Sequence, residues 1–551
     1  MNHSISSSIK HNSKAKSVLL ELEKIHDPII DQFISSIPLD LSTAANRLNK
    51  NYQLDELTIK NRALLKRYIF NFHNQAQTAT KSVDAGLNML SGNDTDLLVA
   101  IHQPNLFAYG GVFKKLILLK ELKAAIYKSN PKKQIVTMFL IVDHDFIGDH
   151  WTKVAQLPNA RSYDGIMEIR FPVKMKKRWQ MTHKNAPPTQ SMLNFWKHEV
   201  KLWIKDTTKA IGIDRGPYLD NLNSFWQFVD KSLSRAKSYA DFNSFLISNI
   251  VNISWHDDTL FVRLSDIPEV FVNGMNFLIK NFEQYSASLK ETENIFKMRG
   301  ITTGMSPNAH LFAPIWLHCI CGSKASGTFK KEGASFICQG SCISCKRDIS
   351  TNFGTLTDQH FVEKLFEISP RAIPILLLLS MDLRCSGIVL GTGGSLRYTI
   401  VASRIFDRFK IPMPIPIIWA SEDEYHGIAQ REALLSSVNT QIQSIDQLNA
   451  LHNELSIDRS SIVPLIRERN ERFERNLSID SILQEIQKIK QRQRKTRESI
   501  RMATRSLNML QMKPSIIDYA VNFGIEKVGP LWSKNLVTNN DLFIPTTPLE
   551  A

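Results

Sequence analysis

The sequence predicts an α/β protein: a Rossmann-like parallel sheet core with helical insertions, a small zinc-ribbon-like module and a C-terminal helical coiled-coil segment. Three observations lead to this prediction. Residues 96–142 and 386–420 each read as an apolar strand, a helix and a second apolar strand. Five of the six cysteines lie within residues 319–345. Apolar residues recur every three or four positions through residues 482–510, as in a coiled-coil seam.

The first strand–helix–strand unit follows from hydrophobic spacing. Leu97–Ile101 is an apolar run of strand length, Val112–Ile126 carries apolar residues three or four apart, and Ile135–Val142 is a second apolar, β-branched run. Both runs are apolar on both faces, as a covered parallel sheet requires. A right-handed crossover makes the two strands neighbours.

Polar and ionisable residues follow each of these two strands. His102, Gln103 and Asn105 come directly after the first strand, and Asp143–Asp145, with His144 at its centre, comes after the second. Ligands of open α/β sheets bind at the carboxyl ends of the strands. The sequence therefore predicts a pocket where these side chains converge. The alternative for His144 is a strand-end histidine held by a neighbouring aspartate.

The second unit contains a glycine-rich turn between Ser386–Leu390 and the helix that runs to Phe409. Gly391, Gly393 and Gly394 form the turn, and Ser395 is a good N-cap. Backbone N–H groups in such a turn can approach an anion closely, so we expect these residues to contact a nucleotide cofactor. Glycine also permits tight turns with no ligand, and that alternative stays open.

The cysteine spacing indicates a metal site. Cys319-x-Cys321 is followed, after sixteen residues, by Cys338-x3-Cys342-x2-Cys345. Paired thiolates at both ends of a short loop provide four soft ligands for tetrahedral zinc. We expect structural zinc bound by Cys319, Cys321, Cys342 and Cys345, with Cys338 or His318 as possible replacements.

Composition sets the broad class. The chain has 551 residues and a net charge of +15, and 43% of its residues are hydrophobic. No apolar run has the length of a membrane span, and the polar N-terminus has no signal-peptide core, so we expect a cytoplasmic protein. The positive charge suits nucleic acid, although a solvated basic face explains it equally well.

These patterns divide the chain into six parts. We expect a disordered tail, an N-terminal helical segment, a first core part with a helical connecting region, a zinc-ribbon-like module, a second core part and a C-terminal helical region, at residues 1–17, 18–95, 96–313, 314–352, 353–430 and 431–551, respectively. The seam in the last part predicts either a homodimer or a hairpin against an earlier helix such as Ile445–Leu455.

Several segments resemble one family. Ala100–Phe107 resembles the Gln-rich strand-end loop of the bacillithiol-biosynthesis cysteine-adding enzymes (BshC), the cysteine ligases, and Val142–Phe146 is similar to their acidic-His-Asp-Phe run. Gly393–Gly394 and Tyr398 match a family turn that is followed one helical turn later by a tyrosine, although the family's proline is missing here. Ile411–Pro414 matches the entry to the next strand. The cysteine module is not typical of the family.

The resemblance implies a ligase that forms an amide between cysteine, or a related amino acid, and an amino-sugar conjugate such as glucosaminyl-malate. ATP or another nucleotide would activate the carboxyl group. His144 would accept the proton, while Asp143 or Asp145 orients its ring or holds the ammonium group. The substrate-binding residues would be His102, Gln103, Asn105, Arg397 and Tyr398.

Two alternatives remain at the level of sequence. A related ligase could act on another sugar or amino acid. A zinc-containing class I synthetase-like protein could instead bind RNA or a nucleotide, although the module shows little of the aromatic and basic interleaving that favours nucleic acid.

Overall fold

A computed structural model gives the fold for residues 14–49, 53–333, 335–354, 359–392, 394–425, 427–440, 445–544 and 546–549. Its centre is a five-stranded sheet with strand order β13-β12-β1-β2-β5 and parallel pairing throughout. The strands are β1 (Asp96–His102), β2 (Ile135–Ile141), β5 (Leu260–Arg263), β12 (Cys385–Leu390) and β13 (Ile415–Ile418). The predicted α/β class with a parallel sheet is confirmed.

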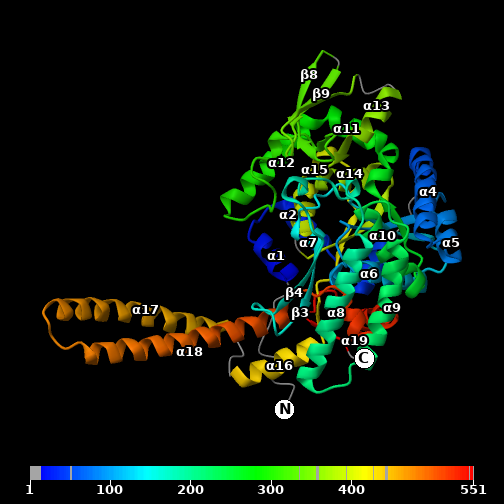
Figure 1. Ribbon diagram of the computed structural model, residues 1–551. Coiled ribbons are helices and arrows are strands. Elements are labelled where there is room, and N and C mark those ends of the chain that lie inside the picture. The colour runs from blue at the N-terminus through cyan, green and yellow to red at the C-terminus, as the bar shows by residue number, and fades with distance from the viewer. Residues whose placement is uncertain are drawn as a thin grey trace.

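Helices cover both faces of this sheet (Figure 1). Side chains of β1 alternate, so that Leu98 and Ala100 join one apolar core and Leu97 and Val99 join the other. The first core is completed mainly by α3 (Leu41–Leu48), α6 (Gly110–Ser129), α8 (Gln190–Ile211), α9 (Gly216–Leu233), α10 (Tyr239–Ser248), α19 (Ile516–Phe523) and α20 (Ile525–Asn539). The second is completed mainly by α1 (Lys14–Glu23), α2 (Pro28–Ser36), α4 (Glu56–Ala76), α5 (Lys81–Met89), α11 (Val272–Lys280), α12 (Phe282–Met298), α14 (Ala372–Met381) and α15 (Gly394–Phe409).

Helix α6 is the crossover between β1 and β2, as the hydrophobic spacing predicts. It begins after Tyr109 and ends at Asn130, whose N–H donates to the carbonyl of Ile126. It is buried on nearly every side, and its buried residues include Lys114 and Lys115. The ammonium groups of these two lysines therefore stay inside the protein.

The cysteine-rich region forms two small antiparallel sheets against the body. One contains β6 (Ile315–His318), β7 (Lys324–Ser326) and β11 (Ile368–Pro370), and the other contains β8 (Thr328–Glu332), β9 (Ser335–Ser341) and β10 (Asp348–Asn352). Ile315, Leu317 and Cys338 join the same apolar core as the central sheet. The region therefore packs as part of the body. Smaller elements are α7 (His150–Lys153), β3 (Val154–Pro158), β4 (Ile166–Arg170), α13 (Gln359–Lys364), β14 (Glu422–Glu424), α16 (Ile428–Thr440) and β15 (Thr546–Pro548).

Two long helices, α17 (Ile445–Glu474) and α18 (Asp480–Gln511), form a hairpin arm that projects from the body (Figure 1). The predicted seam is largely buried, including its polar positions Gln493 and Thr496. The intrachain hairpin is thus present.

At the N-terminal end, residues 14–17 belong to α1, although the sequence predicted a disordered tail over residues 1–17. Residues 1–13 lie outside the described residues. No described helix is long and apolar enough to cross a membrane.

Candidate active site and metal centre

A cavity of about 780 Å³ lies at the carboxyl edge of the central sheet. The strand order changes direction here: the chain leaves β1 toward β2 on one side and later places β12 on the other. Such a switch point separates the loops that follow the two strands and leaves a crevice for a ligand. The register pairs His102 with Ile141 and Ala100 with Val389, so the loops after β1, β2 and β12 meet at one level.

Most of the predicted site residues line this cavity: His102, Gln103, Asn105, His144, Asp145, Gly391, Ser395 and Tyr398. Strand β2 ends at Ile141, so the chain turns before strand alternation could send His144 and Asp145 to opposite faces. Asn105 is buried, and neither polar atom of its side-chain amide has a hydrogen-bond partner among the described residues. An amide left in this state is well suited to bind a polar ligand.

Among the described residues, two predicted ones, Asp143 and Arg397, do not line the cavity. The carboxylate of Asp143 faces the loop after β5, where Oδ1 accepts from the backbone N–H of Ser265 at 3.0 Å. Arg397 does not face a substrate, because its guanidinium donates to Glu21 Oε2 at 2.5 Å and to the Thr302 carbonyl at 2.7 Å. Gly393 lies outside the described residues, and Gly394 is the first residue of α15.

The turn before α15 is closed by a side chain. Ser395 Oγ accepts from the N–H of Gly391 at 2.8 Å and donates to the carbonyl of the same residue at 3.1 Å. A Cβ built on Gly391 would lie 3.1 Å from Ser395 Oγ and 3.8 Å from Lys115 Nζ. A side chain at this position would therefore press on Ser395 at the edge of the cavity.

Two buried lysines of the cavity were missed by the sequence analysis. Lys115 is 8% exposed and donates to the Ile101 carbonyl at 2.8 Å, and burial lowers its pKa to about 8. Lys324 donates to the His144 carbonyl at 2.7 Å, and burial likewise lowers its pKa to about 8. Both ammonium groups have lost most of their hydration, so an anionic ligand would stabilise them.

The cavity histidines are uncharged at neutral pH. Burial, aided by the charge of Lys115, lowers the pKa of His102 to about 3. Burial and the neighbouring His318 and His183 lower the pKa of His144 well below its ordinary value. A histidine so perturbed keeps a free lone pair but is a weak general base, since proton transfer is most efficient when the pKa lies near the working pH. Burial raises the pKa of Asp145, which makes its carboxylate a better proton acceptor than an ordinary aspartate.

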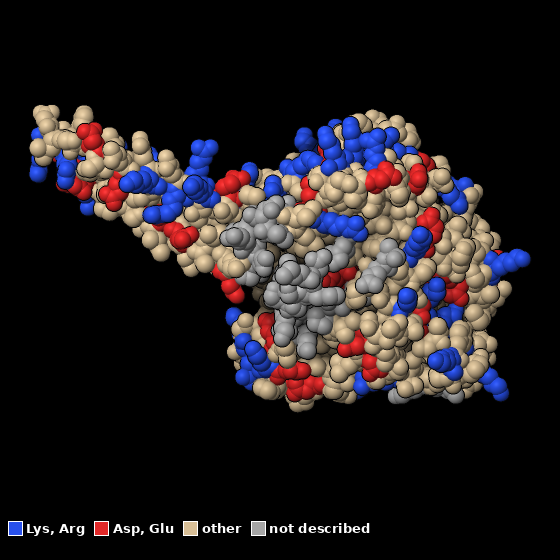
Figure 2. Space-filling model, turned by 90° about the horizontal axis from the view of Figure 1, so that it is seen from below, with Lys and Arg blue, Asp and Glu red and all other residues tan. Residues whose placement is uncertain are grey.

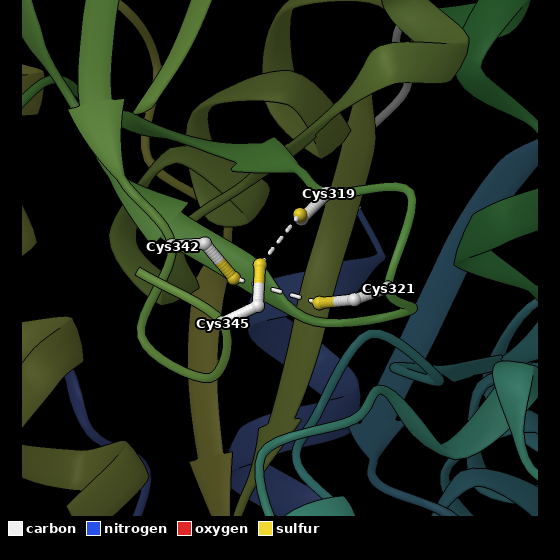
Figure 3. A group of neighbouring side chains, drawn as sticks. All are labelled: Cys319, Cys321, Cys342 and Cys345. Carbon is white, nitrogen blue, oxygen red and sulfur yellow. Dashed lines mark hydrogen bonds between the residues drawn. The ribbon is translucent and has the colours of Figure 1, made fainter. Parts of the chain in front are cut away.

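The four cysteines selected from the sequence form one cluster (Figure 3). Cys319 and Cys321 lie in the turn between β6 and β7, and Cys342 and Cys345 lie in the turn between β9 and β10. The Cys319–Cys345 and Cys321–Cys342 sulfur atoms are 3.5 Å and 3.6 Å apart. Four sulfurs around zinc at about 2.3 Å are separated by roughly 3.8 Å, so the cluster is close to the size that a tetrahedral metal needs.

The two alternative zinc ligands expected from the sequence, Cys338 and His318, do not belong to the cluster. Cys338 is fully buried in the apolar core, where burial raises its pKa to about 12, and it is outside the cluster, as is His318. Within the cluster, burial disfavours the Cys342 thiolate, but hydrogen bonds from the N–H groups of Cys345 and Ser344 outweigh that effect and lower its pKa to about 7. The turn thus stabilises negative charge on sulfur, as a metal ligand requires.

The cysteine turns also hold one wall of the cavity. Gln180 Nε2 donates to the Cys321 carbonyl at 2.8 Å, and the Met181 N–H donates to the Gly322 carbonyl at 2.9 Å. Strand β7, which follows this turn, supplies Lys324 to the cavity. The turn between β6 and β7, which carries two of the cysteines, is therefore hydrogen-bonded to the loop that carries His183.

The sequence did carry one signal for the missed lysines. The four consecutive apolar residues Leu116–Leu119 point to different sides of this helix, and a helix with apolar residues on every side is buried together with the lysines beside them. His183 and Lys324 are brought in by contacts between residues far apart in the sequence, for which hydrophobic spacing gives no signal.

Neither the models of known protein families nor the curated proteins contain a match to this chain.

Proposed function

We propose that this α/β protein is a carbon–nitrogen ligase that joins cysteine, or a related amino acid, to an amino-sugar conjugate such as glucosaminyl-malate. The observation that carries the proposal is the cavity at the switch point, with two buried lysines and the unpartnered Asn105 amide in one place. Its volume of about 780 Å³ suits substrates of this size. The resemblance of the loops after β1 and β2 to the cysteine-adding enzymes supports the same conclusion.

The lysines suit the anionic parts of these substrates. Lys115 lies beside the Gly391 turn and the N-terminus of α15, a place that favours phosphate or carboxylate. Lys324 lines the same cavity and lies beside His144. Between them they would neutralise the malate carboxylates or the phosphates of an activating nucleotide. His102, Gln103 and Asn105 would then bind sugar hydroxyl groups.

The proton balance favours Asp145 as the acceptor. When the sugar amine attacks the activated carboxyl carbon, the C–N bond forms, the bond to the leaving phosphate breaks, and the nitrogen loses a proton. Asp145 has the raised pKa and the cavity position that this step needs. His144 stays neutral and does not act as the principal base.

For the cysteine cluster we propose structural zinc. The sulfur separations fit a tetrahedral site, and the four thiolates fill the coordination sphere with no position left for a substrate. The ion would fix the two turns and through them Lys324.

The test is direct synthesis. The purified full-length chain is incubated with ATP, cysteine and glucosaminyl-malate, and the amide product is measured by mass spectrometry. We expect Asp145→Asn to lower turnover by about 100-fold. Asp214→Asn is the matched control, because this exposed aspartate lies outside the cavity and its Oδ1 accepts the N–H of Gly216, as an asparagine oxygen also can. If no amide forms with any amino acid, and a strain that lacks the protein keeps its thiol metabolites, the proposal is refuted.

One observation favours nucleic-acid binding as a second candidate. Helix α18 carries eight Lys and Arg residues against three Asp and Glu residues. Figure 2 shows basic side chains along the arm, with acidic ones among them. Arg492 is already paired with Asp458, so part of this charge is neutralised within the arm. RNA retention that falls steeply with salt would favour this candidate over the ligase.

A further inference from the structure

A second group of metal-ligating side chains lies beside the cavity, apart from the cysteine cluster. Donor atoms of Asp143, His144 and His183 all lie within 4.8 Å of one another. Nδ1 of His144 is 3.8 Å from Oδ1 of Asp143, and the rings of His144 and His183 have centroids 5.0 Å apart. His318, at the end of β6, adds a third imidazole whose ring centroid is 5.0 Å from that of His144.

Two of these ring nitrogens are buried without a partner. His144 is only 6% exposed, yet its Nδ1 has no hydrogen-bond partner among the described residues. The same holds for Nε2 of His318. Leaving a buried polar atom unpaired is unfavourable, so two of them in one cluster point to a ligand that both can bind.

Hydrogen bonds to neighbouring groups orient the side chains that would bind the metal. Nδ1 of His183 lies 2.9 Å from the Asp143 carbonyl, and Nδ1 of His318 lies 3.2 Å from the Phe366 carbonyl. Because a carbonyl only accepts, each of these nitrogens must carry the proton, which leaves the Nε2 lone pair free. The Asp143 carboxylate is held by the N–H and hydroxyl of Ser265. Metal-bound histidines and carboxylates are typically oriented in this way.

We propose that Asp143, His144 and His183, together with His318, bind a divalent transition-metal ion beside the cavity. Ligands at about 2.0–2.1 Å from zinc are roughly 3.3 Å apart, so the 3.8 Å between His144 and Asp143 closes with a small side-chain rotation. Imidazole with one carboxylate is a donor set for zinc, iron or cobalt.

Positive charge of Lys324 and Lys184 lies near the imidazoles of His144 and His318 and disfavours a cation there. Lys324 directs its ammonium group to the His144 carbonyl and lies 4.6 Å from the centroids of both the Phe146 and Trp316 rings. The Asp143 carboxylate is thus left to balance the ion. The site itself does not depend on the ligase proposal, because it rests on these donors alone.

Cobalt separates this site from the cysteine cluster. The full-length chain is freed of metal with a chelator and titrated with Co²⁺ while the absorbance spectrum is followed. Cobalt bound by four thiolates gives intense near-ultraviolet charge-transfer absorption, whereas cobalt bound by imidazole and carboxylate gives only weak visible bands. We expect about two ions per chain, one of each spectral type.

His183→Ala is expected to weaken the second ion by about 100-fold or more and to leave the thiolate band unchanged. The thiolate band also reports that the region is folded, and His183→Gln provides a second variant of similar size. His150→Ala, at an exposed histidine of α7, is the matched control and keeps both ions. A single cobalt ion with thiolate absorption only, or unchanged binding of the second ion by folded His183→Ala, would overturn the proposal.

Discussion

Replacing Lys115 with methionine is expected to make the protein more stable and less able to bind its ligand. Lys115 is 8% exposed, and burial lowers its pKa from 10.5 to about 8. At 1.36 kcal/mol per pKa unit, holding the ammonium charged in the fold costs about 3 kcal/mol at pH 7. Methionine removes this charge but leaves the Ile101 carbonyl without its donor, which costs roughly 1–2 kcal/mol. The net stabilisation is therefore about 1–2 kcal/mol.

The stabilisation by Lys115→Met should decrease as the pH rises. Because the pKa of Lys115 is lower in the folded state, the cost is fully present below pH 8 and disappears as the unfolded chain also loses its proton near pH 10.5. Urea unfolding at pH 7 and pH 9.5 should show the advantage of Lys115→Met shrinking with pH. Calorimetric titration with the anionic substrate should show binding reduced by about 10-fold or more.

The neighbouring lysine provides a control of opposite sign. Lys114 pairs with Asp423 at 2.9 Å, and both side chains are buried. Lys114→Met removes the counter-charge of a buried carboxylate, which keeps only its hydrogen bonds from Tyr519 and Trp532, and should destabilise the fold by about 3 kcal/mol. If Lys115→Met destabilises the protein equally at both pH values, Lys115 is not a strained charge, and the reasoning fails.

Three further outcomes follow from the structure. Cys342→Ser should remove about one zinc per chain from the purified protein, whereas Cys338→Ser should keep it; equal zinc contents in elemental analysis would contradict this assignment. Burial raises the pKa of Asp382 from 3.8 to about 8, so stability is lost as pH rises through this window, and Asp382→Asn should flatten the loss in unfolding curves at pH 5 and pH 9. Gly391→Val pushes a side chain against Ser395 and Lys115, and calorimetry should show substrate affinity at least about 10-fold lower with the melting temperature nearly unchanged.

The strands that build the sheet were predictable where apolar runs were long. Strands β1, β2, β12 and β13 all coincide with predicted runs, because strands buried on both faces must be apolar throughout. Edge strand β5 was not predicted, since its four residues are too few to show a period and it follows a π-helical turn, Asn249–Ser254.

The candidate site was predictable only in its local part. Residues directly after strand ends, such as His102 and His144, follow from the rule that parallel sheets bind ligands at this edge. Arg397 was misplaced because spacing along α15 does not reveal that α1 brings Glu21 to meet it. His183 was missed for the same reason: its neighbours come from a turn forty residues earlier in the chain.

The projecting arm has a hydrodynamic consequence. Helix α18 has 32 residues and is about 48 Å long at 1.5 Å per residue; its C-terminal end packs on the body, and the rest belongs to the arm. A 62.9 kDa chain with a projecting arm experiences more hydrodynamic drag than a sphere of equal mass. Its elution volume in gel filtration will therefore correspond to a larger apparent mass even for a single copy. The homodimer expected from the seam should be tested by light scattering or sedimentation equilibrium, which measure mass independently of shape.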